Sequence, residues 1–113
     1  MPAGDRDGRP ARLRAQARFL GAWGHLGACG VADAPALAAL AEETTDADLR
    51  ELALAAARGV GPALDAHGGC LEAWLAPVVG GERRAAEHLV AAGDLLEREA
   101  RGASARALLW ARL

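Results

Sequence analysis

The sequence predicts an all-α fold, a compact bundle of five or six short antiparallel helices. Ala (thirty residues) and Leu (seventeen) dominate the composition, and both favour helix. Residue types that favour strands are scarce, because the chain has five Val, two Thr, no Ile, no Tyr and one Phe. The length of 113 residues is that of one domain. Disorder is not expected, since 52% of the residues are hydrophobic and the net charge is only −2.

The first predicted helix begins at Pro10, because a helix start does not use the N–H that proline lacks. Residues 1–9 are polar and contain two Gly and one Pro, so we expect a flexible arm there and a single helical domain over 10–113. Helical spacing then places four small or apolar residues on the inner side of this first helix: Leu13, Ala17, Leu20 and Gly24. Trp23 and Trp74 are expected to fill the core beside such stripes.

Two cap signals predict the starts of the next helices, Asp33 for one and Thr45 for the other. The clearest stripe in the chain follows the second of these caps, at Leu49, Leu52, Ala53 and Ala56. Two short helical pieces with a turn between them are predicted over residues 62–76. A connection without helix is predicted over residues 77–81.

The C-terminal part predicts a long amphipathic helix over 82–101 and then a last helix capped by Ser104. Gly93 lies inside the long helix, where it costs roughly 1 kcal/mol relative to Ala. We therefore expect a close approach of another backbone at this position.

Charge and cysteine content set limits on the environment and the partners. With a net charge of −2, general binding to nucleic acid is not expected, since that affinity comes mainly from neutralising phosphates. No stretch approaches the roughly 20 apolar residues of a membrane span. Two cysteines are too few for a disulfide framework. We expect a cytoplasmic protein with reduced thiols and no membrane partner.

The last residues predict a protein-binding surface. Trp110 lies in the final predicted turn, with Leu109 and Leu113 beside it, and exposed Trp and Arg are common in binding hot spots. Arg14 and Arg18 share a face of the first helix and are expected at the rim. The function we expect is a non-catalytic interaction module, regulatory, adaptor or accessory, that binds a protein partner or forms a homodimer. The alternative is that the Trp ring closes the end of the bundle.

Two His–Cys pairs are candidate metal ligands. His25 and Cys29 are four residues apart on a predicted helix, and His67 and Cys70 flank a Gly-Gly turn. If the pairs meet, they would supply a tetrahedral site for zinc or another transition metal. The segment from His25 to Cys29 also resembles the His-Leu-x-x-Cys opening of zinc-binding anti-sigma proteins, although Ala32 stands where that pattern has a second Cys. Otherwise the thiols are small core residues and no cofactor is expected.

The tetrapeptide Gly59-Val60-Gly61-Pro62 resembles the turn of a helix-hairpin-helix. That resemblance implies nonspecific DNA binding, with backbone amides holding a phosphate. Arg83 and Arg84 would then stand behind a second, degenerate hairpin. Asp65 departs from the motif, because it occupies the small position at which the two helices meet. Without the resemblance, the segment is a Gly-Pro loop that joins two helices.

No catalytic constellation is evident. The hydroxyl residues Ser104, Thr44 and Thr45 stand where helix caps are expected, and no orienting partner is identified for a His67–Cys70 pair. Phosphate-binding Gly-Lys-Ser/Thr and Gly-x-Gly-x-x-Gly motifs are absent from the sequence. We therefore do not expect an enzyme.

Overall fold

The computed structural model describes residues 2–81 and 85–112, with the side chains of residues 8–81, 85–106 and 109. Within these ranges the chain forms six α-helices and two short 3-10 turns, with no strand, so the all-α prediction is confirmed. The α-helices are α1 (Pro2–Ala28), α2 (Asp33–Glu43), α3 (Ala47–Ala56), α4 (Val60–His67), α5 (Ala76–Gly80) and α6 (Ala86–Arg112). The 3-10 turns η1 (Gly68–Cys70) and η2 (Ala73–Leu75) lie between α4 and α5.

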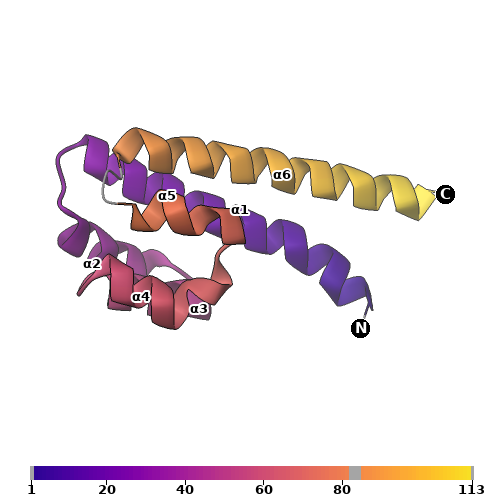
Figure 1. Ribbon diagram of the computed structural model, residues 1–113. Coiled ribbons are helices and arrows are strands. Elements are labelled where there is room, and N and C mark those ends of the chain that lie inside the picture. The colour runs from indigo at the N-terminus through magenta and orange to yellow at the C-terminus, as the bar shows by residue number, and fades with distance from the viewer. Residues whose placement is uncertain (1, 82–84, 113) are drawn as a thin grey trace.

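Helices α1 and α6 form an antiparallel pair that runs the length of the molecule (Figure 1). Each has 27 residues, so the short helices that the sequence predicts are only α2 to α5. These four pack beside one half of the pair, near the end where α1 leads into α2 (Figure 1). The other half, which carries both termini, extends beyond them, and the molecule measures 48 × 26 × 23 Å.

The apolar stripes predicted from helical spacing form the core. Leu20 of α1 and Leu96 of α6 are fully buried, and the whole stripe of α3, with Leu52 at its centre, is buried as well. Complete burial of such a side chain contributes about 1.5–3 kcal/mol. Trp23 is also buried, and its indole Nε1 donates a hydrogen bond to Asp33 Oδ1 at 2.9 Å. This bond ties α1 to the first turn of α2.

Glycines allow α1 and α6 to approach closely. A Cβ atom on Gly93 would lie 3.0 Å from the carbonyl oxygen of Ala17 and 3.2 Å from the backbone N of Gly21. A Cβ atom on Gly24 would lie 2.8 Å from the carbonyl oxygen of Ala86. The close backbone approach predicted at Gly93 is confirmed, and Gly24 contributes a second one.

The predicted start of the first helix was wrong. Helix α1 begins at Pro2, so the boundary expected between residues 1–9 and 10–113 falls inside a helix. Pro10 interrupts one helical hydrogen bond, a local cost that favours a helix start. It is nevertheless buried inside α1, and Arg9 pairs with Glu72 at 3.2 Å and with Glu99 at 3.7 Å. The helix thus continues past Pro10, and residues on both sides of the proline contact the rest of the bundle.

The predicted break before Ser104 was also wrong, because α6 continues to Arg112. Ser104 does not cap a helix; its Oγ accepts a hydrogen bond from Arg14 Nη2 at 3.0 Å, which links α6 to α1. The predicted caps of α2 and α3 were each displaced by one residue. Ala32 precedes α2 without a side-chain cap, and Asp46 Oδ1 caps α3 by accepting from the N–H of Leu49.

Two further predictions in the region of α5 were wrong. Residues 77–81, expected as a connection, mostly belong to α5. Trp74, expected in the core, lies in η2 with 40% of its surface exposed. Within the described residues, no helix combines the length and the apolar character needed to cross a membrane.

Candidate functional site

The outer face of α6 carries two of the four large apolar side chains that are exposed among the described residues. We define it by six residues that are exposed or half-exposed: Ala91, Leu95, Arg98, Gly102, Ala105 and Leu109. Leu95 and Leu109 have exposed fractions of 51% and 62%. The opposite side of the same helix carries Leu89 and Leu96, which are buried in the core. Helix α6 therefore has apolar residues on two opposite sides, of which the fold uses one.

Charge is segregated along α6. From residue 86 to 97 the helix has three acids and no Arg: Glu87, Asp94 and Glu97. From 98 to 112 it has four Arg, at 98, 101, 106 and 112, and one acid, Glu99. The exposed surface is thus acidic over the first half of the helix and basic over the second.

The predicted interaction residues fall into three groups. Leu109 is exposed, as an interface residue must be. Arg14 is half-buried and donates to Ser104 of α6, so its guanidinium group contributes to the α1–α6 contact rather than to a free rim. Arg18 is exposed on α1. Leu113 lies outside the described residues, and so does the side chain of Trp110.

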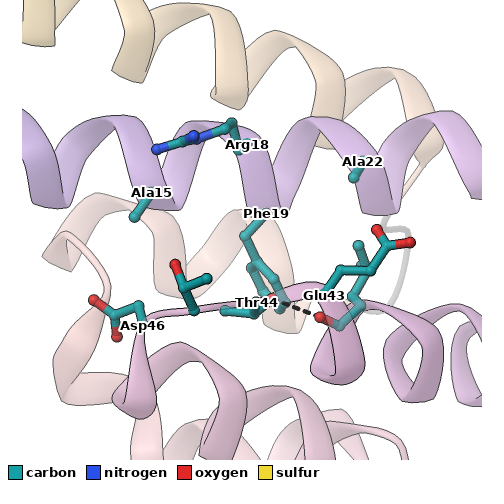
Figure 2. Close-up of a pocket in the computed structure, with 9 residues that line it drawn as sticks. Ala15, Arg18, Phe19, Ala22, Glu43, Thr44 and Asp46 are labelled. Atoms are coloured by element: carbon teal, nitrogen blue, oxygen red, sulfur yellow. Dashed lines mark hydrogen bonds between the residues drawn. The ribbon is translucent and has the colours of Figure 1, made fainter.

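Arg18 lines a hollow of about 270 Å³ between α1 and the connection from α2 to α3. Figure 2 shows Phe19 pointing from α1 toward this connection, with Glu43 and Asp46 beside it. The polar groups of Thr44 are engaged locally, since its Oγ1 donates to the carbonyl oxygen of Leu40 and its own carbonyl accepts from the Arg50 side chain.

A second hollow, of about 430 Å³, lies between α3 and the end of α4. Asp48, Glu51, His67 and Cys70 line it. The thiol of Cys70 donates to the carbonyl oxygen of His67 at 3.4 Å. Burial raises the pKa of this thiol, and the carboxylates of Asp48 and Asp46 raise it further. The group therefore stays protonated at neutral pH, which makes it a poor nucleophile.

The structure does not assemble the two His–Cys pairs into a metal centre among the described residues. His25 and Cys29 are exposed near the end of α1, whereas His67 and Cys70 border the hollow beside α3. Over residues 2–81 and 85–112, no three His, Cys, Asp or Glu side chains come together as ligands. Metal binding by these residues stays a prediction.

The segment that resembles a helix-hairpin-helix turn joins α3 to α4. Gly59 precedes α4 in an extended conformation, and Gly61 is exposed in the first turn of α4. Asp65 is exposed as well, so it does not separate the two helices. Arg83 and Arg84 lie outside the described residues. Phosphate binding by this segment stays a prediction.

Sequence reasoning missed two features of α6 and α1. Leu95 was not singled out, although Leu95, Gly102 and Leu109 stand seven residues apart, a spacing that places them on one side of a helix. Gln16 was also missed: it is buried, and its Oε1 accepts from the N–H of Glu72 at 2.9 Å. It holds the segment after η1 against α1.

No protein-family model, curated protein or solved structure matches this chain. The functional conclusion therefore depends on the residues and geometry given above.

Proposed function

We propose that this chain is a non-catalytic helical interaction module, a regulatory, adaptor or accessory protein that acts through protein–protein contact, with self-association as the first form of that contact. One observation carries the proposal. Two exposed Leu side chains, Leu95 and Leu109, lie on one side of the 27-residue helix α6, opposite the side that packs into the core. Paired apolar residues in one stripe are more informative than single exposed Leu residues, which any protein surface contains.

The chemistry of the two hollows supports the same proposal. The half-buried thiol of Cys70, which stays protonated, and the hydroxyl of Thr44, which donates to a backbone carbonyl of its own helix turn, are both poorly suited to act as nucleophiles. Interfaces, by contrast, need apolar anchors with charged residues around them, and α6 carries both.

Sedimentation velocity and light scattering over a range of micromolar concentrations test this proposal. The expected result is a reversible dimer, with a shift toward monomer in the variant Trp110→Ala. A chain that remains a monomer throughout this range would remove the self-association part of the proposal. Affinity purification with the full chain as bait would then test whether a different protein is the partner.

A further inference from the structure

We propose that a second copy of this chain binds the outer face of α6, so that the two α6 helices pair in antiparallel orientation. The inference rests on the proposed self-association and adds the surface, the orientation and the register. Four observations carry it: spacing, residue size, charge and accessibility.

The spacing along the outer face is that of a two-helix interface. Its six residues follow one another at intervals of four, three, four, three and four. This alternation is the a and d pattern of helices that pack along their length. It spans about 27 Å from Ala91 to Leu109 at 1.5 Å per residue. The fold itself does not account for the pattern, because the core already uses the opposite side of α6.

Residue sizes on this face are complementary in one antiparallel register. With Leu95 level with Ala105 of the second copy, Leu109 lies level with Ala91 and Arg98 with Gly102. Each large residue then meets a small one in every layer, and the two-fold symmetry repeats each pair. In a parallel arrangement in register, Leu would face Leu and Arg98 would face Arg98.

Charge selects the same orientation. Antiparallel pairing places the acidic first half of one α6 against the basic second half of the other, whereas parallel pairing opposes like charges. Arg98 of each copy lies two residues from the two-fold axis and opposite Gly102, which leaves room for its side chain, while Glu99 already pairs with Arg9 of its own chain at 3.7 Å. Asp94 and Arg101 are both exposed, and their spacing of seven residues places them on the same flank of this face, where they supply the two signs.

The face is accessible. Helices α1 and α5 pack against other sides of α6, and Figure 1 draws α6 along an edge of the molecule with no helix above it. The other large apolar residues that are exposed in the described part, Leu54 on α3 and Trp74 on η2, stand on separate elements. Only α6 offers two such residues on one face within the described side chains.

The first test compares Leu95→Glu with the matched control Leu54→Glu. The two leucines have similar exposed fractions, 51% and 54%, and both lie on helices. Sedimentation should give at least about a tenfold weaker dimer for Leu95→Glu and no change for the control, since a buried Leu contact is worth about one factor of ten or more. Leu109→Glu serves as a second variant, and circular dichroism verifies that each variant remains helical.

The second test determines orientation by disulfide cross-linking in a Cys29→Ser, Cys70→Ser background. The variants Leu95→Cys and Ala105→Cys are mixed and oxidised. In the proposed register the two different variants face each other, while identical variants are separated by about 15 Å along the axis, too far for a disulfide. Mixed cross-links are expected to predominate.

The outcomes separate this inference from the proposed function. A dimer that survives Leu95→Glu and Leu109→Glu but dissociates in Trp110→Ala overturns the α6 inference and leaves self-association in place. Cross-links between identical variants overturn the antiparallel register. A wild-type chain that never dimerises overturns this inference and removes the self-association part of the proposed function, while binding to a different protein is tested separately.

Discussion

The contact between α1 and α6 gives the sharpest prediction, through the substitution Gly24→Ala. The added Cβ atom would lie 2.7 Å from Val90 Cγ2, 2.8 Å from the carbonyl oxygen of Ala86 and 2.9 Å from the N of Val90. Real Cβ atoms essentially never approach other atoms within 3.0 Å. Since two of these three atoms belong to the α6 backbone, rotating a side chain does not relieve the contact, and the helices must separate.

The expected magnitude follows from two opposing terms. Overpacking of a tight interior costs about 1–3 kcal/mol. Replacing a helical Gly by Ala increases the free energy of unfolding by about 1 kcal/mol, because Ala has the higher helix propensity. Because the clash involves backbone atoms, the upper part of the first range applies, and we expect a net loss of about 1–2 kcal/mol in the free energy of unfolding.

Gly21→Ala is the matched control on the same helix. A Cβ atom on Gly21 would meet nothing within 4 Å, so only the propensity term remains and stability should increase by about 0.5–1 kcal/mol. Urea unfolding followed by far-UV circular dichroism, at one fixed protein concentration, measures both variants. Equal stabilities of Gly24→Ala and Gly21→Ala would refute the close α1–α6 approach.

Three other expectations can be measured with the same protein. Leu52→Ala should cost about 2–5 kcal/mol because Leu52 is buried, whereas Leu54→Ala on the exposed side of α3 should be nearly neutral; a loss below about 1 kcal/mol for Leu52→Ala would contradict the orientation of α3. Iodoacetamide should alkylate exposed Cys29 faster than Cys70 at neutral pH, and equal rates would contradict the raised pKa. Since folding raises the pKa of the Cys70 thiol, the folded state binds this proton more tightly. The protonated thiol therefore contributes fully to the free energy of unfolding below the ordinary thiol pKa. This contribution is lost as the pH rises through the higher pKa that the thiol has in the folded state. Elemental analysis after purification without chelator should find no equimolar metal; one metal per chain that disappears in Cys29→Ser and Cys70→Ser would restore the His–Cys site.

The interior of the bundle could be predicted from the sequence because burial leaves a periodic signal. Leu49 and Leu52 stand three residues apart with the polar residues Arg50 and Glu51 between them, and both leucines are buried. Gly93 was informative for a different reason: glycine destabilises the interior of a helix, and close packing against another helix accounts for its presence there. Both kinds of inference depend on residues a few positions apart, so no knowledge of the tertiary structure was needed.

Helix ends were harder to predict because tertiary contacts outweigh local cap signals. Pro10 and Ser104 are ordinary markers of helix starts, yet each lies inside a 27-residue helix. The Arg14–Ser104 hydrogen bond joins positions ninety residues apart. Sequence spacing carries no information about such a pair, and the same holds for the bond between Gln16 and Glu72.

The candidate site was predicted only in part. Leu109 was identified from its place beside Trp110, but Leu95 was overlooked because the stripe toward the core accounted for the helix by itself. Arg14 was assigned to the rim from its charge, whereas the structure gives it a partner on α6. A second stripe on the opposite side becomes informative only when the structure establishes which side the core occupies.

The shape of the molecule links its stability to its assembly. The half of the α1–α6 pair that carries the termini extends beyond α2 to α5, so the two long helices pack there without the cover of the short ones (Figure 1). An isolated pair of such helices offsets its conformational entropy poorly. A second copy on the outer face of α6 would bury Leu95 and Leu109, so dimer formation would stabilise the folded chain by mass action. The midpoint of thermal unfolding should then rise with protein concentration for the wild type and for Leu54→Glu, and stay constant for Leu95→Glu. A midpoint independent of concentration in all three proteins would mean that the chain stabilises its long helices without a partner.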